Sequence, residues 1–228
     1  MRTGKLIVLE GTDGSGKSTQ FELLLRRFRK EKIKLVTMKF PQYGKKSAGL
    51  VEEYLRGAYG KKPESVSPYA ASLFYAVDRF DAAQKIKKWL SEGKTVLLDR
   101  YVDSNAAHQG GKIHDPKERK KFLQWLYQTE YNLLSIPQPD LVIITHLPWT
   151  QALKLIQSRQ GRKKTRHDIH DKSTQHLKDT EAAYVWLAKQ YPKNHRLIEC
   201  IKNDTLLPPA EIHEKIWKII TPVLSSRT

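Results

Sequence analysis

The stretch from Gly11 to Thr19, "GTDGSGKST", concentrates residue types that bind phosphate rather than build a core. It fits the pattern G-x-x-x-x-G-K-[ST], with an apolar stretch before it and a helical pattern after it. Glycines let backbone N–H groups approach phosphate oxygens, and a helix N-terminus adds partial positive charge. Lys17 supplies a full charge for the β- and γ-phosphates, and Ser18 offers an oxygen to Mg²⁺. The stretch therefore predicts a nucleoside triphosphate site made by Gly11, Thr12, Asp13, Gly14, Ser15, Gly16, Lys17, Ser18 and Thr19.

Acidic and basic residues lie inside this loop and in a second group, "DRYVDSNAAHQGG" at 99–111. Asp13 in the loop either caps a turn or reaches toward a phosphoryl acceptor. Asp99 ends an expected strand, at the sheet edge where folds of this class bind ligands, and Arg100 follows it. The two are either a structural ion pair or an acid for a metal-bound water beside a cation for phosphate. Next to a phosphate loop, we favour the second interpretation.

A third group, "SLFYAVDRF" at 72–80, places two aromatic residues four and five positions before an arginine. At helical spacing an aromatic residue and Arg79 share one face. The ring would stack on a base while the guanidinium grips a phosphate. The alternative, which this stretch taken alone favours, is a core aromatic residue beside a surface arginine.

Short apolar stretches alternate with helical patterns along the chain. We expect strands at 5–10, 34–40, 95–99, 140–147 and 195–200, and helices at 16–30, 47–56, 68–91, 116–131, 148–158, 173–190 and 208–220. Strands that are short, apolar on both faces and separated by helices predict a parallel sheet covered on both sides. We therefore expect one three-layer α/β domain over residues 1–228, with five parallel strands.

The composition of the chain indicates its cellular compartment and the kinds of partner it could bind. The 228 residues carry 41 Lys and Arg against 24 Asp and Glu, a net charge of +17 that suits an anionic partner or a solubilising surface. The single cysteine, Cys200, excludes a disulfide within the chain, and we expect it to be buried. No stretch has the roughly 20 apolar residues of a membrane span, so we expect a cytoplasmic protein with no membrane partner. The eight histidines match no tetrahedral metal site, and we expect them to face solvent.

The order of these groups resembles the thymidylate kinase family. Glu10-Gly11 running into "DGSGKSTQ" is similar to the start of that family, "FPQYG" at 40–44 to its second-strand exit, and "FYAVDR" at 74–79 to its base-binding helix. "DRYVDSNAAHQG" resembles its third-strand motif, and "PQPDLVIITHLP" resembles the start of its fourth strand. The resemblance covers about residues 4–190. It implies a P-loop kinase fold that transfers the ATP γ-phosphoryl group to dTMP, giving dTDP for dTTP synthesis.

The resemblance implies roles for the residues near the phosphates. Lys17 and Ser18 hold ATP and Mg²⁺, and Asp99 holds the water shell of the metal. Arg100 bridges the donor and acceptor phosphates. Asp13 bonds the dTMP sugar or orders the metal region. The reaction needs little acid–base chemistry, because the acceptor is a phosphate that is already ionised near neutral pH.

For the acceptor, the resemblance implies that Tyr75 stacks on the base, Phe74 then being core, and that Arg79 binds the dTMP phosphate and the base edge. The other implied dTMP contacts are Phe40, Tyr43, Ser104, Asn105, His108 and Gln109. His108 stands where some relatives have tyrosine near the sugar, which leaves discrimination against ribose open.

Some family members carry a basic residue in the phosphate loop where this chain has Gly14, and others supply the cation from a mobile lid. The stretch "RQGRKKTR" at 159–166 lies where the lid should be, and we place the lid at about 159–172. We expect Arg162 to reach over ATP in catalysis, with Arg159 or Arg166 beside it. The alternative is a solvated basic loop or a nucleic-acid contact. His170 stands where the family has glutamate.

Two other functions fit parts of the sequence. Another deoxynucleotide or deoxynucleoside kinase on the same fold would share the loop and the Asp-Arg pair, but "FPQYG" and Ser104-Asn105 favour dTMP. An ATP-dependent nucleic-acid-binding protein would account for the charge, but the cations are scattered and no groove interleaved with aromatic residues is evident. The family also implies a homodimer, for which the helices at 68–91 and 116–131 offer apolar faces.

Overall fold

The computed structural model describes residues 4–160 and 173–226, without the side chains of residues 159 and 160. Five parallel strands form its main sheet, in the order β2-β3-β1-β4-β5. They are β1 (Leu6–Gly11), β2 (Leu35–Lys39), β3 (Thr95–Asp99), β4 (Leu141–His146) and β5 (His195–Glu199). The predicted α/β fold with five parallel strands is confirmed.

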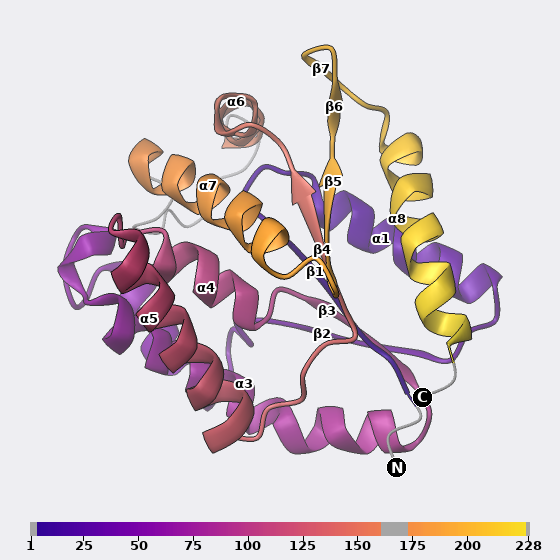
Figure 1. The fold of residues 1–228 in the computed structure, drawn as a ribbon, viewed down its shortest axis with the longest axis horizontal. Helices are drawn as coiled ribbons and strands as arrows, with labels where there is room; N and C mark the ends of the chain where they lie inside the picture. Colours follow the sequence, from indigo (N-terminus) through magenta and orange to yellow (C-terminus); the bar gives the residue numbers. More distant parts are fainter. Residues whose placement is uncertain (1–3, 161–172, 227–228) are drawn as a thin grey trace.

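Successive side chains along each strand point to opposite faces of the sheet, so the core has two layers. In β1, Leu6 and Val8 pack on one face of the sheet, whereas Ile7 and Leu9 pack on the other. The first face is covered by α3 (Pro68–Ser91), α4 (Val102–Gly110), α5 (Pro116–Tyr127) and α7 (Thr174–Gln190), and the second by α1 (Lys17–Lys30) and α8 (Pro209–Ser225). Figure 1 shows α1 and α8 together on one side of the strands. Because both faces are covered, the strands are apolar on both.

The helix α4 has no counterpart among the helices expected from the sequence. Its stretch, "VDSNAAHQG", is rich in small and polar residues and lacks an apolar stripe at helical spacing. Asp103, Asn105 and Gln109 are nevertheless buried. A helix whose polar face is enclosed by protein carries no amphipathic signal, which explains the missed element.

Other boundaries also differ from the expected ones. The helix expected at 116–131 ends at Tyr127 and continues as a π-helix, η3 (Gln128–Leu133), and α8 runs to Ser225 with Pro222 in its last turn. A hairpin of β6 (Ile201–Lys202) and β7 (Thr205–Leu206) follows β5; two-residue strands leave no periodic pattern to predict. The remaining elements are η1 (Lys46–Ala48), α2 (Gly49–Arg56), η2 (Pro63–Ser65) and α6 (Trp149–Gln160).

The expectation that the histidines face solvent is wrong for three of them. His176, His195 and His213 are 4%, 7% and 8% exposed. The His195 ring lies 2.9 Å from a carboxylate oxygen of Asp103, which offsets the cost of its burial. The His213 ring stacks on an aromatic neighbour in α8, but its buried Nδ1 has no hydrogen-bond partner among the described residues. Cys200 is buried, as expected. Over residues 4–160 and 173–226, no helix has the length and apolarity needed to cross a bilayer.

Candidate active site

The phosphate loop connects β1 to α1, and its lysine points back over it. The Lys17 ammonium donates to the carbonyl oxygens of Gly11 and Thr12 at 2.8 and 2.7 Å, and lies 3.9 Å from a carboxylate oxygen of Asp13. Burial, aided by the charge of Arg100, lowers the pKa of Lys17 to about 8. Folding therefore places the Lys17 ammonium where burial disfavours its positive charge. An anion bound beside Lys17 would relieve that cost.

Two loop glycines are required by close packing. Gly11 has φ 140°, and a Cβ there would lie 2.5 Å from the carbonyl oxygen of Thr145. Gly14 has φ 81°, and a Cβ there would lie 2.6 Å from the carbonyl oxygen of Ala152 in α6. The backbone of α6 thus occupies the space that a side chain at position 14 needs. This contact explains why the loop of this chain carries glycine at that position.

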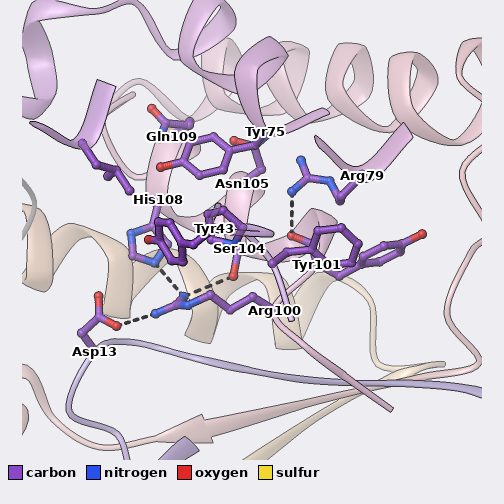
Figure 2. Close-up of a pocket in the computed structure, with 13 residues that line it drawn as sticks. Asp13, Tyr43, Tyr75, Arg79, Arg100, Tyr101, Ser104, Asn105, His108 and Gln109 are labelled. Carbon is purple, nitrogen blue, oxygen red and sulfur yellow. Dashed lines mark hydrogen bonds and ion pairs between the residues drawn. The ribbon is translucent and has the colours of Figure 1, made fainter. Parts of the chain in front are cut away.

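Arg100 is held at the junction of the loop and the acceptor side. It follows β3 with φ 67°, an uncommon left-handed conformation for a residue with a side chain. Its guanidinium donates to Asp13 at 2.5 Å and to the Ser104 hydroxyl at 3.2 Å, and lies 3.2 Å from Nε2 of His108 (Figure 2). Because β1 and β3 are neighbours in the sheet, their carboxyl ends bring Asp13 and Arg100 together.

A buried carboxylate binds the backbone of the residues that follow Arg100. Glu10, which is fully buried, accepts from the backbone N–H groups of Tyr101 and Ser104 at 2.7 and 3.0 Å and from the Tyr184 hydroxyl at 2.8 Å. Burial raises its pKa, and the Arg100 charge acts in the opposite direction. Glu10 therefore fixes the first turn of α4 relative to β1. In the sequence, Glu10 is visible only as part of a motif, because this role depends on a tyrosine 174 positions away.

A pocket opens beside Arg100, with about 680 Å³ of empty space that includes its mouth. All the residues predicted to contact the acceptor line it: Asp13, Phe40, Tyr43, Tyr75, Arg79, Arg100, Ser104, Asn105, His108 and Gln109. Pro41, Leu55 and Tyr101 complete the wall. Phe74, expected in the core, does not line this pocket; it is half-buried and packs near the ring of Tyr54.

Arg79 is buried, so the alternative of a surface arginine is wrong. Its side chain is 2% exposed because it donates to both carboxylate oxygens of Glu130, at 2.5 and 2.6 Å, and Glu130 is fully buried. The same carboxylate lies 3.4 Å from the side-chain nitrogen of Asn105. Sequence reasoning missed Glu130, which lies in the π-helix η3; one acid in a helical pattern gives no signal, although π-helical turns often mark functional sites.

Two predicted metal-binding residues lie outside the pocket wall. Ser18 is exposed in the first turn of α1, and Asp99 lies at the end of β3, 3.5 Å from the Lys39 ammonium. Within the described ranges no group of three His, Cys, Asp or Glu side chains forms a metal cage. A hydroxyl and a carboxylate beside a triphosphate site nevertheless suit Mg²⁺, which binds few protein oxygens and keeps phosphate and water ligands. The residues present fit such an ion.

The predicted lid lies mostly outside the described residues. Arg162, Arg166, Asp168 and His170 all fall at 161–172, and the side chain of Arg159 is also not described. The expectations for these residues stay predictions. On either side of this range, the described chain ends in α6 and resumes at α7, next to the phosphate loop and the pocket.

The comparisons with known proteins agree with this geometry. The family model described as thymidylate kinase matches residues 9–216. The chain belongs to the thymidylate kinase family. Members of this family are phosphotransferases, so the chain is a nucleotide-binding kinase of nucleotide biosynthesis that works with a divalent metal.

Individual relatives match four fifths of the chain or more. A thymidylate kinase of Mycobacterium tuberculosis is 33% identical over 187 residues, which are 81% of this chain and 86% of the relative. A probable thymidylate kinase of Thermococcus onnurineus is 34% identical over 230 residues, covering 97% and 99% of the two chains. The structure of a thymidylate kinase from Candida albicans, 23% identical, aligns over 98% of this chain and 93% of its own with a TM-score of 0.69, and so supports the fold.

Proposed function

We propose that the chain transfers the γ-phosphoryl group of ATP to dTMP, giving ADP and dTDP. The observation that carries this proposal is the contact between Asp13 in the phosphate loop and Arg100 on the wall of the pocket, at 2.5 Å. A triphosphate held on the loop and a monophosphate held in the pocket would meet at this contact. The family to which the chain belongs supports the choice of substrates.

On the donor side, the loop amides and Lys17 bind the β- and γ-phosphates. The Lys17 ammonium would exchange the carbonyl oxygens of Gly11 and Thr12 for phosphate oxygens. Ser18 and the water shell held by Asp99 would bind Mg²⁺. When bound, the metal ion would neutralise negative charge on the phosphates of ATP. Arg162 is proposed to add a further cation from the lid.

On the acceptor side, Arg100 binds the phosphate of dTMP and turns it toward the loop. Tyr75 stacks on the thymine. We assign Arg79 to the base edge rather than to the phosphate, because Glu130 already neutralises its charge. The Gln109 carboxamide and the Oδ1 atom of Asn105 are buried without a hydrogen-bond partner among the described residues. Such groups favour a ligand that supplies the missing bonds, and the polar edge of a base does so.

The reaction then needs positioning and charge neutralisation rather than a base. The acceptor oxygen belongs to an ionised phosphate, so it attacks without giving up a proton. Arg100 sits where the two anionic groups approach each other, and Asp13 and Ser104 fix its direction. Bringing two anions into line accounts for most of the catalysis expected of such a site.

We also propose that the chain forms a homodimer through α3. Leu73, Val77 and Phe80 lie on one face of this helix and are 45%, 50% and 52% exposed. Three large, exposed apolar residues at helical spacing favour a protein partner. The same face of a second copy of the chain would bury all three side chains together. Sedimentation should give about twice the chain mass. A monomer at micromolar concentration would contradict the dimer without touching the catalytic proposal.

The function is tested by chromatographic detection of the phosphorylated products from a panel of acceptors, with Mg²⁺ and ATP present. We expect kcat/KM to be highest for dTMP, lower for dUMP, and far lower for dCMP and for thymidine, which lacks the phosphate that Arg100 binds. A preference for thymidine or dCMP would favour another deoxynucleoside or deoxynucleotide kinase instead. Tight, steeply salt-dependent DNA binding without turnover would favour the nucleic-acid alternative.

A further inference from the structure

A chain of polar contacts leads from Arg100 to the first turn of α7. The Arg100 guanidinium lies 3.2 Å from Nε2 of His108, and Nδ1 of His108 lies 3.1 Å from Nε2 of His176. Figure 2 shows the His108 ring beside the Arg100 guanidinium, on the side near Asp13. These contacts connect α4 and α7, two helices far apart in the sequence.

The direction of each hydrogen bond follows from chemistry. A guanidinium only donates, so Nε2 of His108 must accept and cannot carry a proton. The His108 proton is then on Nδ1, which donates to Nε2 of His176. His176 therefore accepts at Nε2 and carries its own proton on Nδ1. This hydrogen bond holds the His108 proton on the side away from Arg100.

The surroundings of His176 suit an acceptor. It is 4% exposed, and the Ser173 hydroxyl accepts from its backbone N–H at 3.1 Å, which anchors the residue in the first turn of α7. Burial, together with the positive charge of Lys112, lowers the pKa of His176 to about 4. The carboxylate of Asp13 acts weakly in the other direction. At neutral pH the ring is uncharged and Nε2 is available to accept.

We propose that His176 is a positioning residue that, through His108, holds the Arg100 guanidinium toward the phosphate loop. The two histidines act as one unit, with the tautomer of His108 fixed by His176. Asp13 and Ser104 also accept hydrogen bonds from Arg100 and partly fix the orientation of its guanidinium. The two histidines restrict that orientation further. The kinetic consequence rests on the proposed function, whereas the tautomers do not.

The tautomers are tested by NMR of the full-length protein labelled with ¹⁵N-histidine, with resonances assigned through His108→Phe and His176→Phe. We expect His108 to be protonated at Nδ1 and not at Nε2, and its resonances to shift in the His176→Phe protein. Thr180→Val is the matched control, because Thr180 is buried one turn further along α7 and its hydroxyl has no partner among the described residues. A proton on Nε2 of His108 would overturn the proposal.

The positioning role is tested by steady-state kinetics of the same variants. His176→Phe should lower kcat about five- to tenfold, as expected for one lost hydrogen bond, with both KM values nearly unchanged. His176→Gln should restore most of the activity, because its carbonyl oxygen can accept from His108. Thr180→Val should match the wild type.

A double-mutant cycle separates positioning from general damage to the helix. If His176 acts through His108, then His176→Phe should cost nothing further in a His108→Phe background. An equal loss in both backgrounds, or no rescue by glutamine, would overturn the proposal. A wild-type protein with the expected tautomers but no dTMP phosphorylation would contradict the proposed function and leave the histidine pair intact.

Discussion

The two halves of the site are built in different ways. The donor side is one continuous loop, Gly11 to Thr19, whose binding groups are backbone N–H groups and one lysine. The acceptor side is assembled from segments between residues 13 and 130, and its binding groups are side chains that other side chains hold. A loop of backbone groups tolerates little change in shape, whereas a pocket of side chains can be adjusted at several places. We therefore expect substitutions on the donor side to act mainly on kcat, and substitutions on the acceptor side to act mainly on the recognition of dTMP.

The largest effect is expected on the donor side, for Lys17→Met. Loss of the ammonium should lower kcat about 10³-fold, because a charge aimed at the transferred group is removed. The folded protein should melt at the same or a higher temperature, since folding lowers the pKa of Lys17 and thus disfavours its charge. Coupled ADP release and thermal melting test this pair of effects. A large loss of thermal stability would mean that Lys17 is chiefly structural.

The next effect should appear at the junction of the two halves, for Arg100→Lys. Lysine keeps the charge but cannot contact Asp13, Ser104 and His108 together, so kcat should fall about 10²-fold. The apparent affinity for ATP should change little. Rapid-quench measurement of the chemical step distinguishes this from slow product release. A variant within threefold of the wild type would remove Arg100 from the reaction.

A smaller and more selective effect is expected deep on the acceptor side, for Glu130→Gln. The change leaves the Arg79 charge buried with a weaker partner, which should cost about 3 kcal/mol of stability. The KM for dTMP should rise about tenfold while the KM for ATP stays constant. Glu118→Gln is the matched control, because Glu118 is exposed on α5, where it pairs with the surface residue Lys121. Equal changes in both KM values would contradict a role confined to the acceptor side.

The smallest effect is expected outside both halves, at His146 in β4. Burial acts to lower its pKa, but hydrogen bonds to Glu199 and Glu181 outweigh burial and raise it. A raised pKa means that the stabilisation is complete below about pH 6.5 and is lost as pH rises through the folded-state value. The stability difference between wild type and His146→Gln should therefore be larger at pH 6 than at pH 8.5, by urea unfolding. A constant difference would contradict this.

The same contrast explains what the sequence could predict. The phosphate loop lies in nine consecutive residues, so its chemistry was evident before any fold was known. The five strands were predicted because both faces of each are apolar, and that pattern is local. The acceptor residues were predicted through the family resemblance, and the structure gathers them around one pocket.

What the sequence could not supply are the partners that hold these side chains. Glu130 is 51 positions from Arg79, and His176 is 68 positions from His108, so no local pattern connects them. The helix that carries Ser104 and Asn105 was missed because its polar face is buried. Such contacts arise from the packing of α3, α4 and α7, which depends on the whole chain.

In the proposed reaction, two nucleotides meet end to end at the Asp13–Arg100 contact. The most direct test is isothermal titration with a single molecule that joins adenosine and thymidine through a chain of five phosphates. We expect one molecule to bind per chain, more tightly than ATP or dTMP alone, and to be displaced by either nucleotide. Binding that only ATP or only dTMP can displace would contradict a shared site.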